Sequence, residues 1–383
     1  MKFLHLGDVH LGKTLNDYDL SRDQKYMLDQ IIGIAEERSV DGILIAGDIY
    51  DKSVPSESAT KLLDQFLNSL IEKGKKVFMI SGNHDSDERL NYGSSVFRSK
   101  GVYIYAKYNG TLQKETLKDE YGEIDIWMLP FVKASQVRHF FPKEKIETYD
   151  AAVRTALSQA DIDPQRRNII ISHQFVAGKS SDPDLSGSEG IGVKSVGTVE
   201  KVGYDCFDLF DYAALGHIHS PQSVGRYEVR YSGSPLKYSL SEVTNDKSVP
   251  LITMGPKGEI GVELIKLNPL RDMRHLKGPF EKITDKENIS GTDDFIYVTL
   301  TDEDIIDDAM GIIQRIYPNT IKLDYENSRT NPVRRKIEAK KAKSPEELFG
   351  DFYRKMYGCE ISDEEMQIIK EAAKEAGVID ETD

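Results

Sequence analysis

The sequence predicts an α/β protein, and three observations carry that prediction. Short apolar runs recur through the first two thirds of the chain, most of them end in a polar loop that contains glycine, and amphipathic helical segments follow several of them. Continuous apolar runs are typical of strands buried on both faces, with helices as the crossovers between them. The predicted strands are residues 2–6, 42–46, 76–80, 124–129, 168–171 and 212–215, and the predicted helices are residues 21–39 and 56–74.

The pattern becomes β-rich after residue 219. Residues 226–231, 249–254 and 261–267 resemble strands, and the Gly-Pro-Lys-Gly sequence at 255–258 predicts a hairpin turn between the last two. These segments predict a second sheet that packs against the first.

A smaller α/β unit and a helical tail are predicted at the end of the chain. Residues 295–300 and 320–325 resemble strands on either side of a helix at 303–317, and a basic linker follows. Ser344 and Ser362 are each followed three residues later by glutamate, the signature of a helix N-terminus with a capping box. The predicted units are residues 1–277, 278–331 and 332–383.

The composition argues against a membrane-spanning or disulfide-rich protein. No apolar run approaches the roughly 20 residues that a membrane span needs. The two cysteines, Cys206 and Cys359, exclude a disulfide framework and a thiolate-rich metal site. The first residues lead directly into Gly7-Asp8 without the apolar stretch of a signal peptide. We therefore expect a cytoplasmic protein with no membrane partner.

The net charge of −14 argues at first against nucleic acid as a partner, because phosphate backbones are bound by clustered Lys and Arg. The charge is unevenly distributed. Residues 344–383 hold twelve acidic and four basic residues, whereas residues 329–343 hold seven basic residues and one acidic residue. The global sign therefore decides little, and a solvated linker followed by a solvated helix face is the simplest alternative.

Eight polar residues follow predicted strands and carry the candidate chemistry. Asp8 and His10 lie two residues apart, and His217 and His219 repeat that spacing. Residues i and i+2 of an extended backbone point to the same side, so each pair can reach one cation. Open α/β sheets bind ligands at the carboxyl ends of their strands, where these residues lie. The full set is Asp8, His10, Asp48, Asn83, His84, His173, His217 and His219.

The donor set combines oxygen and nitrogen without sulfur. Such ligands favour manganese or iron over magnesium, and zinc is also compatible. Two cations about 3.5 to 4 Å apart suit phosphoester hydrolysis, because they activate water and stabilise charge on the attacking and leaving oxygens. Asp48 could bridge the two ions through its two carboxylate oxygens. His84 could bond the scissile phosphate or protonate the leaving alkoxide. Asp85 could orient His84, or it could be only a surface charge.

The ordered set of motifs is far more specific than any of its parts. A single D-x-H or H-x-H pair is usually a satisfied surface or core pair, and Gly82-Asn83-His84-Asp85 alone could be a turn. Here D-x-H, G-D-x-x-D, G-N-H-D, a histidine after a strand and G-H-x-H follow one another in this order. His5, His139 and His275 fall outside the set, and His5 is expected to be a packed core histidine.

These five blocks resemble the calcineurin-like metallophosphoesterase superfamily over residues 1–270, and the opening sequence is similar to its SbcD family of bacterial nucleases. The resemblance implies a β-sandwich flanked by helices, a small α/β capping domain and a C-terminal helical tail. It implies that Asp8, His10, Asp48 and His219 hold one metal ion. It also implies that Asp48, Asn83, His173 and His217 hold the other, that Asp48 bridges, and that His84 is the catalytic histidine.

The resemblance also implies partners and a substrate. Members of that family use manganese, form homodimers and bind an SbcC-type, SMC-like ATPase. The complex cuts double-stranded DNA ends as an exonuclease and hairpins as an endonuclease, in DNA repair, recombination and replication. A nucleoid-associated location follows. The chain has no P-loop of its own, so ATP would act through the partner.

Three segments fit this scheme. Residues 278–331 resemble the domain that positions DNA, and residues 90–101 correspond to the dimer interface, although an ordinary surface helix fits them nearly as well. The tail resembles the helices that dock the ATPase, with packing onto the chain's own core as the alternative. Its apolar residues at helical spacing are Leu348, Phe349, Phe352, Tyr353, Met356 and Tyr357.

Two other classes of function remain open from the residues. The same ligands serve a phosphatase or phosphodiesterase for small phosphoesters, although such an enzyme leaves the residues after the catalytic domain unexplained. A noncatalytic scaffold is the third class, and the presence of every expected ligand argues against it.

Overall fold

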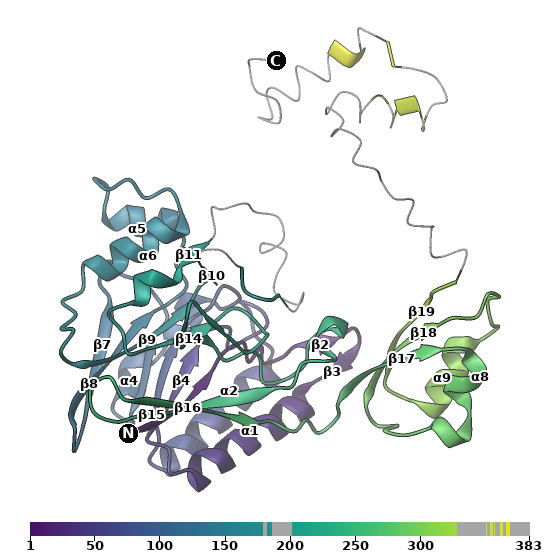
Figure 1. The fold of residues 1–383 in the computed structure, drawn as a ribbon, viewed down its shortest axis with the longest axis horizontal. Coiled ribbons are helices and arrows are strands. Elements are labelled where there is room, and N and C mark those ends of the chain that lie inside the picture. Colours follow the sequence, from purple (N-terminus) through teal and green to yellow (C-terminus); the bar gives the residue numbers. More distant parts are fainter. Residues whose placement is uncertain are drawn as a thin grey trace. The chain divides into compact units, whose positions relative to one another are not determined.

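The computed structural model describes residues 1–178, 182–185, 201–327 and isolated positions between 350 and 367. The chain divides into two compact units, Met1–Asp324 and Tyr325–Asp383. In the first unit, two six-stranded sheets pack face to face with helices outside them (Figure 1).

The first sheet is built around four parallel strands. The sequence predicts three of them, and the fourth, β6, is not predicted. Its strand order is β16-β15-β1-β4-β5-β6, with β15 and β16 antiparallel to their neighbours. The strands are β1 (Lys2–Leu6), β4 (Gly42–Ala46), β5 (Lys76–Ile80), β6 (Val102–Tyr105), β15 (Ser248–Met254) and β16 (Ile260–Lys266).

The second sheet contains three parallel strands at its centre, β8, β9 and β12, with β14 also parallel to β12. Its order is β13-β14-β12-β9-β8-β7. The strands are β7 (Gln113–Asp119), β8 (Gly122–Leu129), β9 (Arg167–His173), β12 (Tyr212–Gly216), β13 (Gln222–Val224) and β14 (Arg226–Tyr231).

The strands predicted after residue 219 are present, but they do not form a sheet of their own. β14 joins the second sheet, whereas the β15–β16 hairpin returns to the first sheet and pairs with β1. The reason is that β1 has an open edge on the side away from β4, and pairing there satisfies its backbone groups. Strand periodicity does not reveal which sheet edge a strand completes.

The two sheets and the helices on their outer faces form four layers, and an apolar core fills each of the three spaces between the layers. Side chains such as Phe3, Phe78 and Ile171 fill the space between the sheets. Helices α1 (Ser21–Glu37) and α2 (Glu57–Glu72) cover the outer face of the first sheet, and α5 (Ala134–Phe140) and α6 (Tyr149–Ser158) pack against the second (Figure 1). The central strands β4, β9 and β12 are thus buried on both faces, as continuous apolar strands require.

Short elements complete this part of the unit. They are β2 (Thr14–Leu15), β3 (Tyr18–Asp19), α3 (Asp87–Asn91), α4 (Ser94–Arg98), β10 (Val176–Ala177), β11 (Val202–Gly203), η1 (Tyr204–Phe207) and η2 (Leu240–Glu242).

A three-stranded sheet follows, in the order β17-β18-β19. The predicted helix at 303–317 is shorter than expected and begins only at Ala309, because Asp308 has a left-handed backbone with a φ of 51°. The elements are β17 (Met273–Gly278), α8 (Phe280–Thr284), η3 (Lys286–Asn288), β18 (Phe295–Leu300), α9 (Ala309–Ile316) and β19 (Thr320–Tyr325). The expected boundary at residue 278 falls at the end of the first of these strands.

The second unit is described at few positions. The predicted capping box at Ser362 is confirmed, since its hydroxyl accepts from Glu365 N at 3.3 Å while Glu365 Oε2 accepts from Ser362 N at 3.0 Å. Of the predicted apolar stripe, only Tyr353 and Met356 are described, and the basic linker and the Ser344 capping box lie outside the described residues. Within the described part of the chain, no helix has the length and apolar character to cross a membrane.

Candidate functional site

The candidate residues sit where parallel strands of both sheets end. Asp8 and His10 follow β1, Asp48 follows β4, Asn83 and His84 follow β5, His173 ends β9, and His217 and His219 follow β12. Hydrogen bonds from Asp8 N to Gly47 O at 3.2 Å and from His10 N to Asp48 O at 2.9 Å hold the first two loops together. The structure thus brings all eight predicted side chains into one region.

The loops that carry these residues have unusual backbones. Among the described residues, seven non-glycine residues have a positive φ, and four of them are candidates: Asp8 (54°), His10 (48°), Asp48 (49°) and His217 (104°). Such conformations are costly for residues with a Cβ and gather at functional sites. The expectation that the D-x-H and H-x-H pairs lie on extended backbone is therefore wrong. Left-handed turns, and not strand alternation, aim these side chains at one another.

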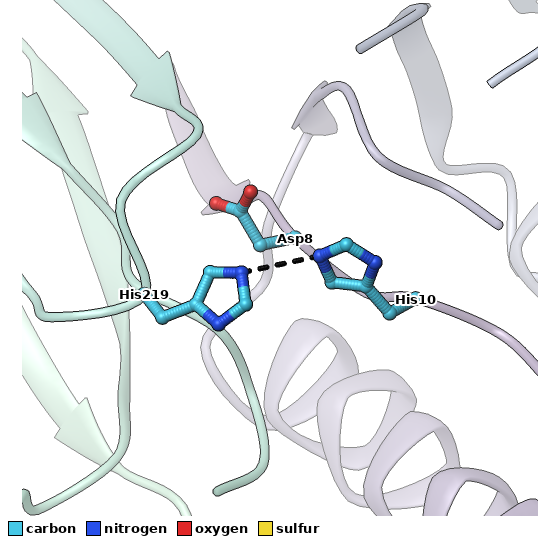
Figure 2. Close-up of side chains that lie close together, drawn as sticks. All are labelled: Asp8, His10 and His219. Atoms are coloured by element: carbon cyan, nitrogen blue, oxygen red, sulfur yellow. Dashed lines mark hydrogen bonds between the residues drawn. The ribbon is translucent and has the colours of Figure 1, made fainter. Parts of the chain in front are cut away.

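Asp8, His10 and His219 form a first cluster (Figure 2). The Nε2 atoms of His10 and His219 are 3.1 Å apart, and a donor atom from each of the three residues lies within 4.8 Å of the others. All three side chains are buried. The backbone N–H of His217 donates to both carboxylate oxygens of Asp8 at 3.0 Å, which fixes that carboxylate.

Asn83, His173 and His217 form a second cluster. The Oδ1 atom of Asn83 lies 3.0 Å from His173 Nε2 and 2.9 Å from His217 Nδ1. His173 Nδ1 lies 2.7 Å from the backbone oxygen of Ala46, and because that oxygen can only accept, Nδ1 carries a proton and Nε2 faces the cluster. His173 is fully buried, whereas Asn83 is exposed.

Asp48 lies between the two clusters. Its Oδ2 atom is 3.7 Å from His10 Nε2 and 3.4 Å from His173 Nε2. Its Oδ1 atom accepts from the backbone N–H of His84 at 2.9 Å. One carboxylate therefore lies within 3.7 Å of a histidine of each cluster, a position compatible with a bridging role.

Glycines beneath the site allow this close packing. A Cβ on Gly82 would lie 2.1 Å from Asp48 Oδ1, and a Cβ on Gly47 would lie 2.6 Å from His173 Nδ1. Gly47 also has a φ of 82°, which residues with a side chain rarely adopt. Both positions therefore exclude larger residues.

The charges of the site fit a cationic ligand. Burial would raise the pKa of Asp48, but the charge of His173 outweighs it and holds this pKa well below its usual value. Burial lowers the pKa of His173, but the Asp48 charge and hydrogen bond outweigh it and raise the pKa to about 9. Burial raises the pKa of Asp8 to about 6 and lowers that of His217 to about 3.

Two groups of buried side chains bring one donor atom from each member within 4.8 Å of the others: Asp8, His10 and His219, and Asp8, Asp48 and His173. Such an arrangement suits a shared cation. The set contains carboxylates, imidazoles and an amide oxygen and contains no thiolate, so it fits divalent cations such as manganese or iron. The residues present thus suit two metal ions, one at each cluster.

His84 differs from the other seven residues because its ring lies beside His10 and Asp51, with one donor atom of each of the three within 4.8 Å of the others. Its Nδ1 atom lies 3.0 Å from the backbone oxygen of Asp51, so Nδ1 carries a proton there. The ring stands edge to face against His10, with centroids 4.9 Å apart. This arrangement fixes the ring through Nδ1 and leaves Nε2 for a further partner.

The expectation that Asp85 orients His84, or is only a surface charge, needs correction. The Asp85 carboxylate accepts from the backbone N–H groups of Gly82 (2.9 Å), Ile49 (3.1 Å) and Tyr50 (2.9 Å). Asp85 therefore connects the loop after β5 to the loop after β4 through hydrogen bonds. The group that orients the His84 ring is the backbone oxygen of Asp51.

A buried charged pair that the sequence patterns did not predict lies behind the first cluster. Glu242 Oε1 lies 3.7 Å from His219 Nδ1, and Glu242 Oε2 pairs with Lys247 Nζ at 2.5 Å. Lys247 also donates to the backbone oxygen of His219 at 2.9 Å. Carboxylates behind ligating histidines fix ring orientation and increase basicity. No local motif marks Glu242, because Lys247 is 5 residues and His219 is 23 residues away in the chain.

Comparisons with known proteins identify the family of this chain. A family model described as calcineurin-like phosphoesterase matches residues 1–221, and one described as the type 5 capsule protein repressor C-terminal domain matches residues 269–357. The SbcD component of the nuclease SbcCD from Staphylococcus epidermidis is 35% identical over 377 residues, which cover 97% of each chain. A crystal structure of a dimetal phosphatase from Danio rerio matches 70% of this chain and 98% of its own, with 10% identity and a TM-score of 0.39. The chain therefore belongs to the calcineurin-like phosphoesterases and, among them, to the SbcD nuclease family.

Proposed function

We propose that this protein is the metal-dependent DNA nuclease subunit of an SbcCD-type complex. It hydrolyses phosphodiester bonds at double-stranded DNA ends and at hairpins. The observation that carries the proposal is the pair of clusters that Asp48 connects, with the His84 ring fixed beside them. The Staphylococcus epidermidis relative, which is a nuclease subunit, supports the choice of reaction.

Each cluster would hold one divalent ion, with manganese favoured by the donor set. Asp8, His10, Asp48 and His219 would hold one ion, and Asp48, Asn83, His173 and His217 would hold the other. Bound ions supply an activated water and stabilise the charge that develops on the phosphate.

His84 is the residue that we propose to act on the substrate. Its Nδ1–H donates to Asp51 O, so Nε2 is the nitrogen available to bond a phosphate oxygen or to protonate the leaving alkoxide. The backbone N–H of His84 donates to Asp48, which ties the histidine loop to the carboxylate that both ions would share. Asp85 contributes only by holding that loop in place.

The remaining parts of the chain would serve DNA and partner binding. We propose residues 1–277 as the nuclease domain, residues 278–331 as a domain that positions DNA, and residues 332–383 as the segment that docks an SbcC-type ATPase. ATP would then act through that partner. Tyr92 and Val96, 86% and 69% exposed and four residues apart in the chain, support residues 90–101 as a homodimer contact, because large exposed apolar side chains are common at interfaces.

A cleavage assay tests the proposed reaction. The full chain with Mn²⁺ is incubated with end-labelled duplex and hairpin DNA, with and without an SbcC-type ATPase and ATP. We expect DNA cleavage that the ATPase and ATP increase. Hydrolysis of mononucleotides without any DNA cleavage would instead support a phosphatase for small phosphoesters, which the same ligands could serve.

Two variants test the assignments within this scheme. His84→Ala should retain both metal ions but lose about 10²- to 10⁴-fold in cleavage rate, the usual range for a lost acid or base. Metal content measured beside activity separates this result from a lost metal site. Truncation before Ser344 should abolish co-purification with the ATPase and spare metal-dependent hydrolysis. If the truncated chain still bound the ATPase, the docking assignment would be wrong.

A further inference from the structure

A pocket of about 480 Å³ opens beside the second cluster and has no role in the chemistry described above. Its floor includes Gly82 and Asn83, so it begins at one of the proposed ligands. Its walls come from the segment after β6 and from helix α5 with the residues before it. We call it the aromatic pocket, because the side chains that line it include Tyr108, Phe131, His139 and Phe140.

The rings of the aromatic pocket are arranged as a connected set. Phe140, which ends α5 and is 40% exposed, stands edge to face against Tyr108 with centroids 5.7 Å apart and against His139 at 5.2 Å. Phe131 lies edge to face against the ligand His173 at 6.2 Å. Exposed aromatic faces are costly in water, and they are what single-stranded nucleic acids stack on.

The aromatic pocket also contains a polar group that the chain does not satisfy within its described residues. Tyr108 is 8% exposed, and its hydroxyl has no hydrogen-bond partner among the described residues. Burial raises the pKa of Tyr108 to about 12, so the hydroxyl keeps its proton and can donate. A buried unpaired hydroxyl is unfavourable, and a polar ligand would satisfy it.

Positive charge at the rim of the pocket suits a phosphate group next to Asn83. Lys107 and Lys133 both line the pocket and are exposed, and Lys107 pairs with Glu88 outside it. Of the two acidic residues in the lining, Asp85 is bound by three backbone N–H groups, and Asp87 accepts from the N–H of Glu88 at 2.9 Å. Lys133 is the cation best placed to meet a phosphate.

We propose that the aromatic pocket receives one unpaired nucleobase of the strand being cut, next to the scissile phosphate. This inference rests on the proposed function and adds a substrate feature to it. The volume lies within the range of about 300–1,000 Å³ that small-molecule pockets occupy, so it suits a single nucleoside. Cleavage would then require the terminal base pair to open, and ends with a mismatched terminal pair would be cut faster than paired ends.

The test combines a change in the pocket with a change in the DNA. In the presence of Mn²⁺, we compare the wild-type full chain with Phe140→Ala and Phe140→Tyr. The three substrates are a normal oligonucleotide, an oligonucleotide with abasic residues at its end, and bis(4-nitrophenyl) phosphate, which has no base. Tyr26→Ala is the control, because Tyr26 on α1 is equally exposed (41%) and lies outside the pocket lining.

We expect Phe140→Ala to lose about tenfold in kcat/KM on the normal oligonucleotide, the size of one lost base stack. Phe140→Tyr should retain activity, and bis(4-nitrophenyl) phosphate should be hydrolysed equally by all variants. The abasic ends should slow the wild type by the same factor and should not slow Phe140→Ala further.

Two results would overturn the inference while leaving the proposed function intact. One is cleavage of normal DNA by Phe140→Ala at the wild-type rate. The other is an equal loss by this variant on all three substrates, which would indicate a structural role for Phe140. If no variant cut any DNA but all hydrolysed bis(4-nitrophenyl) phosphate, the proposed function would fail and the inference with it.

Discussion

The first and second clusters use similar ligands but differ in their surroundings. Asp8, His10 and His219 are at most 2% exposed, and Glu242 and Lys247 lie behind His219. In the second cluster only His173 is fully buried, while Asn83 is exposed and borders the aromatic pocket. The first cluster is therefore held rigidly, whereas the second is accessible from solvent. We therefore expect substrate to approach from the side of the second cluster.

The largest expected effect comes from the residue that both clusters share. Asp48→Asn removes the charge that faces His10 and His173, so we expect both metal ions to be lost together. Two ions that each stabilise the transition state by several kcal/mol imply a fall in kcat/KM of at least about a thousandfold. Metal content by mass spectrometry and hydrolysis of bis(4-nitrophenyl) phosphate measure the two effects.

Asp29→Asn serves as the matched control for Asp48→Asn, since Asp29 is an exposed carboxylate that pairs with Lys25 on the surface of α1. If Asp48→Asn lost a single ion and kept the other, the carboxylate would belong to one cluster, and the bridging assignment would be wrong.

The next effect should be confined to the first cluster. Glu242→Gln removes the carboxylate behind His219, and losses of such carboxylates usually weaken metal affinity by about 10- to 100-fold. A Mn²⁺ titration followed by electron paramagnetic resonance should show one weakened ion and one unchanged ion. Glu263→Gln, which changes an exposed carboxylate that pairs with Arg38, is the control. Equal weakening of both ions would point to a general loss of packing instead.

A packing change at Gly82 should affect both clusters. The Cβ of Gly82→Ala would lie 2.1 Å from Asp48 Oδ1, so the shared carboxylate must move. Insertions into a packed region cost about 1–3 kcal/mol, and the midpoint of urea unfolding measures this loss. Gly33→Ala is the contrasting variant, because Gly33 lies on the exposed side of α1 with no atom within 4 Å of an added Cβ. It should raise the free energy of unfolding by about 0.4–1 kcal/mol.

The sequence predicts those features of the fold and of the candidate site that depend on neighbouring residues. Local patterns predicted most of the central strands and the eight candidate residues that the structure brings together, because buried strands and the polar residues that follow them are neighbours in the chain. They did not predict that the β15–β16 hairpin joins β1, nor that Glu242 stands behind His219, because both depend on contacts between distant segments. They also missed the left-handed backbone of Asp8 and His10, since spacing alone does not reveal φ.

The smallest expected effect is a difference in how the two clusters respond to pH. With the pKa of His173 at about 9, its ring carries a proton at neutral pH, and an ion that binds the second cluster must displace that proton. The affinity of this cluster should therefore rise about tenfold per pH unit up to about pH 9. In the first cluster, burial keeps the pKa of His10 well below its usual value, so this ring is already neutral, and only Asp8, with a pKa of about 6, competes with the ion. Its affinity should change little above pH 6 and fall below it. Mn²⁺ titrations at pH 6, 7 and 8 measure both affinities, and parallel slopes for the two ions would show that the clusters titrate as one.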